Sequence, residues 1–469
     1  MIALTRILSV AILGFCLGAV NAQQPNIIMI MTDDLGWGDV GFNGNKVIRT
    51  PNLDRLAAEG VTFDRFYAAA PVCSPTRASV LTGRNPFRMG ITHANTGHLP
   101  EEEVTLPELL QEAGYRTGFF GKWHLGTLTT KQRDSNRGGR SEHQQHFSIP
   151  TMHGYDEFFC TEAKVPTHDP MVIPASFLEG ESRRYGWKAR EKGEVVEAYS
   201  TAYWDGQEQP VFENLAGANA RVITDRVIPF IEQSNQQGNP FFATVWFHTP
   251  HLPVVTDSLH RSLYVGHSLQ EQLYYGSITA MDDKIGRLWQ RLEELGLAAN
   301  TMLWFCSDNG SEQGTPGSTG VFRERKRSLY EGGVRVPAFV VWKDRLQGGK
   351  RIDTPLSTVD YLPTLVGILK LTYSHPGNLD GINVWAHLKG GKRKRKVPMG
   401  FLFQEKMSWV DDRFKMITID GGSTWELYDL KKDPTEMENL ILNKSRRADR
   451  MRNALKKWEG AVYRDFSRL

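Results

Sequence analysis

Cys73, Pro75 and Arg77 have the spacing of residues that begin a helix with a reactive group at its N-terminal end. Proline is favoured in the first turn of a helix, where its missing N–H would have no partner in any case. Cys73 would then face the end of the helix that attracts anions, and Arg77 would follow one turn later on the same face. The short pattern alone also fits an ordinary buried cysteine in front of a helix.

Four side chains with oxygen ligands form a second candidate group. Asp33 and Asp34 are adjacent, and so are Asp308 and Asn309 much later in the chain. Hard oxygen ligands select Ca²⁺ or Mg²⁺ over zinc. An Asp-Asp pair alone is weak evidence, because loops commonly carry acids. If each pair follows a β-strand, the four side chains can bind one cation through their oxygens. We therefore predict a Ca²⁺ or Mg²⁺ site.

The candidate catalytic groups share one regularity, which is that each follows an apolar run within a few residues. They are Lys122 and His124, His248 and His251, and the acidic groups at 33–34 and 308–309. In open α/β sheets, ligand sites lie beyond the carboxyl ends of the strands. We therefore expect these side chains to converge in space.

The apolar runs themselves predict strands covered on both faces, because they lack the alternation of half-buried strands. They are residues 26–31, 118–120, 241–247, 302–306 and 337–342. Helical segments lie between them, at residues 52–59, 106–113, 218–233 and 273–295. Strands that alternate with helices predict the α/β class, with helices on both faces of the sheet.

The C-terminal part predicts a separate, smaller unit. Three stretches read as antiparallel strands (398–403, 409–419 and 423–430), and a turn at 433–434 precedes a final helix. We predict a catalytic domain over residues 23–385 and an α+β subdomain over residues 386–469. The basic run 392–396 between them is predicted to be a solvated linker and not a nucleic-acid patch.

Two stretches look like insertions. Residues 127–148 are rich in Gln, Arg, Ser and Gly and predict a mobile surface loop. Residues 179–205 carry Arg183, Arg184, Tyr185, Trp187, Tyr203 and Trp204. These side chains either pack locally or form a cleft wall that stacks on sugars and contacts anions.

The N-terminus and the composition indicate an exported globular protein. Arg6 precedes the apolar run 7–20, and Val20-Asn21-Ala22 approximates a cleavage site, which predicts a signal peptide over residues 1–22 and a secreted or periplasmic protein. No later stretch of the 469 residues reaches the ~20 apolar residues of a membrane span. A net charge of +3 gives no case for nucleic acid or a membrane surface. Cys160 and Cys306 could form a disulfide, provided that they meet in space.

The chain resembles the type I sulfatases of the alkaline phosphatase superfamily. The motif at Cys73 continues into Leu81-Thr82-Gly83, as in that family, and residues 121–126 match its Gly-Lys-Trp-His-Leu-Gly block without a mismatch. The resemblance extends from residue 26 to residues 433–434. It implies a large mixed, mostly parallel sheet sandwiched by helices, with a small C-terminal α+β subdomain.

The same resemblance implies the nucleophile and the metal. A maturation enzyme would oxidise Cys73 to formylglycine, an aldehyde whose hydrate attacks sulfur. The metal would usually be Ca²⁺. Its ligands would be Asp33, Asp34, Asp308, Asn309 and an oxygen of the modified Cys73.

Four further residues match positions of the family's catalytic groups. Arg77 would steady the deprotonated nucleophile, and Lys122 would contact the hydrate and the sulfate. His124 would take the proton when the sulfo-enzyme intermediate collapses and releases sulfate. His251 would donate a proton to the leaving oxygen, with His248 as the competing choice for this role.

The match is less regular at the remaining positions. Lys326 stands where the family has a sulfate-binding lysine, but Arg325 precedes it in place of a small residue, so Arg325 or Arg327 could take the role instead. Thr167 and His168 could add a hydroxyl or an imidazole to the substrate site.

We therefore expect a sulfatase that acts on a sulfated carbohydrate, because export and the aromatic and arginine side chains of 179–205 favour a sugar over a small aryl sulfate. A phosphonate or phosphodiester hydrolase of the same superfamily could use the same modified cysteine. A sugar-binding protein that has kept the fold and lost turnover is the second alternative.

Overall fold

The computed structural model describes residues 24–176, 188–189, 197–206, 209–375, 377–390 and 394–467. The predicted signal peptide at 1–22 lies outside these residues, and so do Arg183, Arg184, Tyr185 and Trp187. Among the described residues, no helix has both the length and the apolar character needed to cross a membrane.

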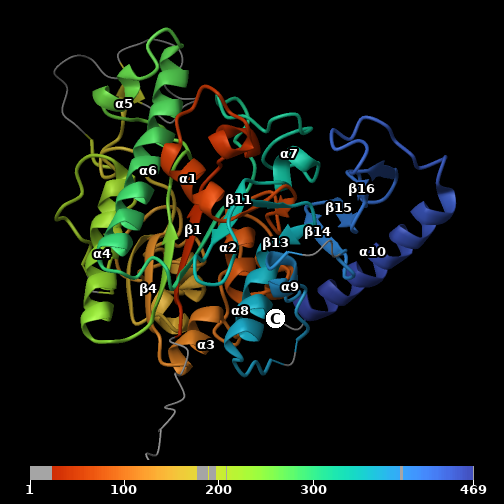
Figure 1. The fold of residues 1–469 in the computed structure, drawn as a ribbon, viewed down its shortest axis with the longest axis horizontal. Coiled ribbons are helices and arrows are strands. Elements are labelled where there is room, and N and C mark those ends of the chain that lie inside the picture. The colour runs from red at the N-terminus through yellow and green to blue at the C-terminus, as the bar shows by residue number, and fades with distance from the viewer. Residues whose placement is uncertain are drawn as a thin grey trace, which may run out of the picture.

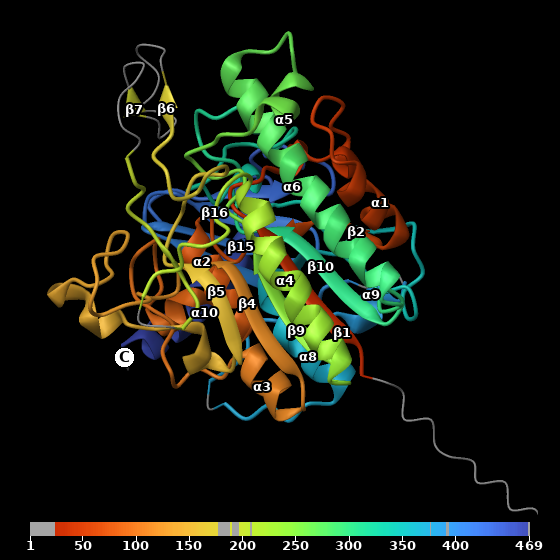
Figure 2. The same ribbon diagram turned by 90° about the vertical axis from the view of Figure 1, so that its left-hand side faces the viewer.

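A nine-stranded sheet forms the centre of the described structure (Figures 1 and 2). In spatial order its strands are β12 (Lys350–Ile352), β2 (Val61–Phe63), β11 (Ala338–Val341), β10 (Thr301–Ser307), β1 (Asn26–Thr32), β9 (Phe241–Trp246), β4 (Arg116–Lys122), β5 (Glu157–Thr161) and β8 (Tyr203–Trp204). The five central strands from β10 to β5 are parallel, whereas β11 and β8 run antiparallel to their neighbours. The predicted α/β sheet, mixed and mostly parallel, is confirmed.

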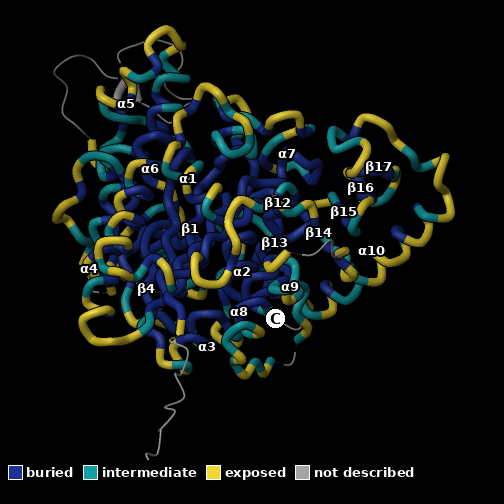
Figure 3. The backbone as a smooth tube through the Cα atoms, viewed as in Figure 1, coloured by how far each residue is buried: buried dark blue, intermediate teal, exposed yellow. Residues whose placement is uncertain are grey.

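Both faces of the sheet are covered by helices, which explains the unbroken apolar strands. Along β1, Ile27 and Met29 face one core, and Ile28 and Ile30 face the other. One face packs against α2 (Cys73–Thr82), α3 (Leu106–Glu112) and α8 (Tyr361–Leu369). The other face packs against α1 (Pro51–Glu59), α4 (Asn219–Gln236) and α6 (Leu269–Glu294), and Figure 2 shows α4 and α6 in front of the strands. Figure 3 shows the resulting buried centre and exposed rim.

Shorter elements connect this framework. They are β3 (Phe66–Tyr67) paired with β13 (Leu356–Ser357), β6 (Ala175–Ser176) paired with β7 (Lys188–Ala189), and the short helices α5 (Ser258–Ser262), α7 (Glu331–Val334) and α9 (Trp385–Leu388). Short 3₁₀ helices lie at Trp37–Asp39, Gly41–Asn43, Pro86–Met89, Ser141–His146, Pro150–His153 and Thr358–Asp360.

The C-terminal part forms a four-stranded antiparallel sheet with one long helix (Figure 1, right). The elements are β14 (Met399–Phe403), β15 (Lys406–Val410), β16 (Phe414–Thr418), β17 (Glu426–Asp429) and α10 (Ser445–Phe466). The predicted single strand over 409–419 is wrong, because β15 and β16 are separate strands joined by a turn. In that turn, the Asp411 side chain accepts hydrogen bonds from the backbone N–H groups of Arg413 and Phe414.

Residues 127–148 lie largely at the surface, as predicted, but buried residues hold part of the segment to the rest of the chain. Asp134 and Arg137 are buried, and the Asp134 carboxylate accepts hydrogen bonds from Ala202 N and Trp204 Nε1, both at 2.9 Å. These contacts tie the segment to β8. Tyr203 and Trp204 are themselves buried, which supports local packing over a cleft wall for these two aromatics.

The linker prediction is wrong for Arg395. Its guanidinium is buried and donates to both Asp360 carboxylate oxygens, at 2.7 and 3.0 Å. Lys392 and Arg393 lie outside the described residues.

All three cysteines of the described chain are free. Cys160 lies on β5 and Cys306 on β10, and β4, β9 and β1 separate these two strands in the sheet. The disulfide that the sequence left open therefore does not form.

Candidate active site

The carboxyl ends of the parallel strands bring the acidic candidates together. Asp33 and Asp34 follow β1, and Asp308 follows β10, which pairs with β1 so that Thr32 lies opposite Ser307. Asp34 N donates to Asp308 Oδ1 at 3.2 Å, and Asn309 Nδ2 donates to Asp34 Oδ1 at 2.7 Å. Asp34 has a φ of 66°, a left-handed conformation that non-glycine residues adopt mainly at functional sites. The two predicted acidic pairs form one cluster.

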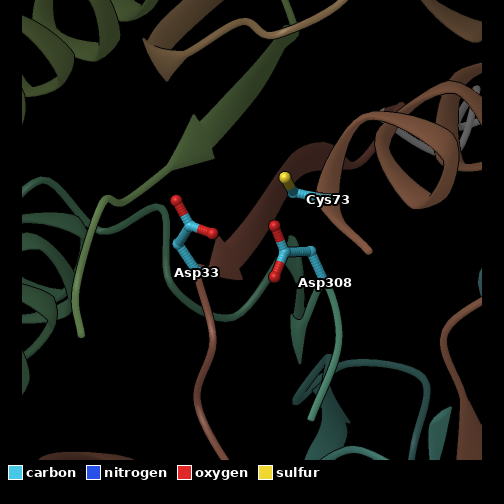
Figure 4. A group of neighbouring side chains, drawn as sticks. All are labelled: Asp33, Cys73 and Asp308. Carbon is cyan, nitrogen blue, oxygen red and sulfur yellow. The ribbon is translucent and has the colours of Figure 1, made fainter. Parts of the chain in front are cut away.

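Cys73 is the first residue of α2 and points into this cluster. Its Sγ and one carboxylate oxygen each from Asp33 and Asp308 lie within 4.8 Å of one another. Figure 4 shows the thiol and both carboxylates directed at a common space. The predicted helix start is confirmed, and Cys73 is 2% exposed. Burial raises the pKa of the thiol, so the unmodified side chain is a poor thiolate nucleophile.

Three cations balance the three carboxylates. Arg77 Nη2 lies 2.6 Å from Asp308 Oδ2, Lys122 Nζ lies 2.7 Å from Asp33 Oδ2, and Lys326 Nζ lies 2.6 Å from Asp34 Oδ1. All six side chains are buried. Charges removed from water need partners of opposite sign, which these pairs supply.

The pKa values of the carboxyls reflect this crowding. Burial opposes ionisation of Asp33, but Lys122, His251 and Arg77 hold its pKa well below the usual range. Burial and the neighbouring charge of Asp33 raise the pKa of Asp308 to about 7. Two carboxyls this close separate in pKa because both cannot ionise freely, and a bound cation relieves such repulsion.

His124 has one ring nitrogen held and the other free. Its Nε2 lies 3.0 Å from Asn95 Oδ1, whereas its buried Nδ1 has no hydrogen-bond partner among the described residues. Because Oδ1 can only accept, this contact places the proton on Nε2 and leaves a lone pair on Nδ1. Burial and the charge of Lys122 lower the pKa of His124 well below its usual value. The ring is thus a neutral base with an unoccupied acceptor.

The two histidines after β9 differ in their contacts. His251 Nδ1 lies 2.6 Å from Leu252 O, and its Nε2 lies 3.6 Å from Asp34 Oδ2 at the edge of the acidic cluster. Both ring nitrogens of His248 are occupied, by Thr161 Oγ1 at 2.8 Å and Asn219 Oδ1 at 3.0 Å, and the residue is fully buried. This geometry favours His251 over His248 as the proton donor.

The three consecutive basic residues Arg325, Lys326 and Arg327 differ in their contacts. Arg325 turns away and donates to the backbone oxygens of Glu312 and Thr315. Arg327 is exposed and pairs with the Glu312 carboxylate. Of the three basic residues, Lys326 alone reaches the acidic cluster.

Thr167 and His168 lie beside the site with their polar groups engaged. Thr167 Oγ1 donates to Val255 O at 2.6 Å and accepts from Val255 N at 2.8 Å. His168 Nδ1 lies 3.2 Å from Asp169 Oδ2. Neither residue contacts the acidic cluster directly.

Sequence reasoning missed Asn95 and Glu312. Asn95 stands in the loop between α2 and α3, far from any strand end, so the regularity that found the other groups does not apply to it. Glu312 lies 3.4 Å from Lys326 Nζ. The sequence did contain one indication of its role, which is that Glu312 follows the predicted metal ligand Asp308 by only four residues.

Comparison with known proteins agrees with this geometry. The sequence model of the family described as Sulfatase matches residues 25–371, and the model described as N-sulphoglucosamine sulphohydrolase, C-terminal, matches residues 317–459. Arylsulfatase G of Rattus norvegicus is 33% identical over 436 residues, which cover 87% of this chain and 78% of that protein. N-acetylgalactosamine-6-sulfatase of Homo sapiens is 33% identical over 396 residues, which cover 80% of this chain and 68% of that protein.

A solved structure shows the same architecture. It is described as Ps i-CgsB in complex with k-i-k-neocarrahexaose, is 25% identical, and superposes with a TM-score of 0.77 over 95% of this chain and 98% of that one. The family match spans most of the chain, and relatives above 30% identity do so as well. The chain therefore belongs to the sulfatase family and is a sulfuric ester hydrolase.

Proposed function

We propose that this enzyme is an exported, Ca²⁺-dependent sulfatase that removes sulfate monoesters from a sulfated carbohydrate, with formylglycine made from Cys73 as the nucleophile. The substrate class rests on the relatives, one of which is named as an N-acetylgalactosamine-6-sulfatase and another of which was solved with a neocarrahexaose. Export rests on the sequence of residues 1–22.

The proposal rests above all on the proximity of Cys73 to the acidic cluster of Asp33, Asp34 and Asp308. Its Sγ lies within 4.8 Å of a carboxylate oxygen of Asp33 and of Asp308. A nucleophile at this position would lie beside the residues that would hold a metal and beside the cations of the site. An ordinary buried cysteine would have apolar neighbours instead.

The donor set fits a calcium ion. Asp33 Oδ1 and Asn309 Oδ1 are buried and have no hydrogen-bond partner among the described residues. Such orphaned oxygens are costly unless something binds them. With Asp34 and Asp308 they supply hard oxygens on one side of Cys73, as Ca²⁺ prefers. The bound ion would supply Lewis-acid stabilisation of negative oxygens at the reacting centre.

The unmodified Cys73 thiol is poorly suited to act as the nucleophile, which favours its conversion to formylglycine. The raised pKa of the thiol leaves it protonated near neutral pH. Once formed, the hydrated aldehyde would supply an oxygen nucleophile, and the sulfated enzyme could then release sulfate without direct attack of water on the ester. This conversion requires a maturation enzyme in the host.

The remaining side chains divide the acid, base and binding work. Arg77 and Lys122 place positive charge beside the nucleophile, where charge builds up on the sulfuryl oxygens. His124 presents the free lone pair of Nδ1 as the base. A bound sulfate would favour the imidazolium form of His251, which can then donate a proton to the leaving alcohol.

A desulfation screen tests the proposal. The purified enzyme, with the state of the Cys73 peptide established by mass spectrometry, is incubated with defined sulfated oligosaccharides, and released sulfate is measured. We expect release by protein that carries the aldehyde, loss of release in Cys73→Ala, and loss on calcium chelation with recovery on adding Ca²⁺. Equal activity of Cys73→Ala would contradict the proposed nucleophile. Activity that survives complete chelation would contradict the role of the metal.

A further inference from the structure

Lys164 is a cation beside the active site that has no counter-ion. It is exposed, and no hydrogen bond or ion pair joins it to any other described residue. Its neighbours Ala163 and Val165 are buried, so the backbone is held in place while the side chain projects to the surface. The ammonium group of Lys164 is therefore available to a ligand.

The chain position of Lys164 places it at the catalytic edge of the sheet. Strand β5 ends at Thr161, which lies opposite Lys122 at the end of β4. Thr161 Oγ1 donates to Ala163 O at 2.6 Å and also contacts the ring of His248. A little farther on, Thr167 is fixed to the segment that follows His251, through Val255. Lys164 therefore lies on the segment that runs from the end of β5 toward the residues that follow β9. The neighbouring strands β4 and β9 lead into the catalytic residues Lys122 and His251.

The charges that act on Lys164 are those of the site. Its pKa is lowered, first by desolvation and then by the positive charges of Lys122 and Lys326, whereas Asp34 and Asp33 act in the opposite direction. These four groups lie within electrostatic range of its ammonium. An anion bound between Lys164 and the catalytic cations would relieve their mutual repulsion.

The other cations at this edge already have partners. Arg327 pairs with Glu312. Arg137 donates to Gly97 O at 2.7 Å, and its Nε lies 3.8 Å from Glu162 Oε1. Arg325 donates to backbone oxygens. Among the described residues, Lys164 is thus a positive charge close to the catalytic cations that is available to a second anion.

We propose that Lys164 forms a subsite for a second anionic group of the substrate, a carboxylate or a further sulfate on the sugar next to the ester that is cleaved. This inference rests on the proposed function and narrows it from sulfated carbohydrates in general to polyanionic ones. A lone sulfate ester, as in an aryl sulfate, reaches only the buried cations Arg77, Lys122 and Lys326. A polyanionic chain also reaches Lys164.

Matched substrates test the subsite. The first pair is a sulfated disaccharide with a carboxylate on the sugar next to the ester, and the methyl ester of that carboxylate. The second pair is a disulfated and a monosulfated form of one disaccharide. The variants are Lys164→Met, Lys164→Arg and, as a control, Lys457→Met, which changes an exposed lysine of α10. The quantity measured is the ratio of kcat/KM values within each pair.

We expect the wild-type enzyme to prefer the substrate with the additional anion in at least one pair. Lys164→Met should reduce this preference by about 5- to 10-fold, Lys164→Arg should keep most of it, and Lys457→Met should leave it unchanged. The preference should also weaken as the salt concentration rises. The pair that responds identifies the anion as carboxylate or sulfate.

A wild-type enzyme without preference in either pair would overturn the subsite. So would a preference that survives Lys164→Met, or one that Lys457→Met reduces equally. Hydrolysis of 4-nitrophenyl sulfate by the same samples separates this failure from failure of the proposed function. An enzyme that hydrolyses no sulfate ester at all refutes the function, whereas one that hydrolyses the aryl ester and ignores the second anion refutes only the subsite.

Discussion

At the scale of single residues, the site is built from pairs that join one carboxylate with one cation. Arg77 with Asp308, Lys122 with Asp33 and Lys326 with Asp34 give zero net charge over six buried side chains. The divalent ion that we propose would add positive charge to the carboxylates, which suits an anionic sulfate ester. The same pairing makes each member sensitive to removal of its partner.

The role of Lys326 can be separated from that of its neighbour. Lys326→Ala removes a cation from the site and leaves Asp34 uncompensated, so we expect kcat/KM for 4-nitrophenyl sulfate to fall by about 100-fold or more. Arg327→Ala removes an exposed ion pair with Glu312 and should cost less than about threefold. Steady-state kinetics of both variants decide the register, and equal losses would refute the assignment of Lys326.

Leaving-group dependence tests His251 as the general acid. Burial lowers its pKa to about 4, so the ring becomes an effective acid only when the anionic substrate raises that pKa. His251→Ala should lower kcat/KM for a sugar sulfate by about 100-fold or more, because an alcohol needs a proton to depart. For 4-nitrophenyl sulfate, which releases a stable phenolate, the loss should be much smaller. Losses of the same size on both esters would contradict the role.

At the scale of elements, the site exists because parallel strands end at one edge of the sheet. The sequence was sufficient to predict β1, β4, β9 and β10 and the groups that follow them, because strands buried on both faces give continuous apolar runs. It was not sufficient for Asn95, whose approach to His124 depends on the path of a loop. It also did not reveal that Asp134 and Arg137, within the polar segment 127–148, are buried and bound to other parts of the chain.

Strand packing beside Lys122 depends on a glycine. Gly121 has a φ of 114°, and a Cβ there would lie 1.9 Å from Trp246 O on the adjacent strand β9. Gly121→Ala should therefore lower the free energy of unfolding by more than about 3 kcal/mol, from backbone strain and the clash together. Gly114→Ala is the matched control, because its φ is 85° but a Cβ would meet nothing within 4 Å. It should cost about 1–2 kcal/mol.

Urea denaturation of both glycine variants measures these costs. The expected order is a larger loss for Gly121→Ala than for Gly114→Ala. Equal losses would show that the positive φ alone, and not the approach of β9, requires the glycine.

At the scale of the whole molecule, the C-terminal subdomain is joined to the catalytic domain through a buried ionic cluster. Lys415 on β16 lies 3.0 Å from Glu331 Oε1 on α7 and 2.9 Å from Glu436 Oε1. Tyr67 donates to Glu331 Oε2 at 2.9 Å. Apolar contacts around Tyr67, Leu329, Phe401 and Tyr428 surround this junction. The two units are therefore expected to unfold together.

Removal of the central lysine should destabilise this junction in a pH-dependent way. Lys415→Met leaves the buried Glu436 carboxyl without its cation and leaves Glu331 with Arg335 alone, at 3.3 Å, and should cost about 3–5 kcal/mol near pH 8. Burial raises the pKa of Glu436 from 4.5 to about 7, so the folded state binds a proton that the unfolded state has released between these values. Stability from this group therefore falls as pH rises through that window, and the cost should be smaller near pH 5.5.

Urea denaturation at pH 8 and pH 5.5 measures the free energy of unfolding of the wild type and of Lys415→Met. Lys432→Met, which changes an exposed lysine, is the control. A cost that does not depend on pH would mean that Glu436 keeps its charge in the folded variant.

The central claim is that this site performs sulfuryl transfer from an ester to a nucleophile made from Cys73. The most direct measurement compares kcat/KM for 4-nitrophenyl sulfate with kcat/KM for a 4-nitrophenyl phosphodiester, using Ca²⁺-loaded enzyme whose Cys73 peptide carries the aldehyde. We predict a clear preference for the sulfate ester and loss of that activity in Cys73→Ala. Greater efficiency on the phosphodiester would contradict the assignment.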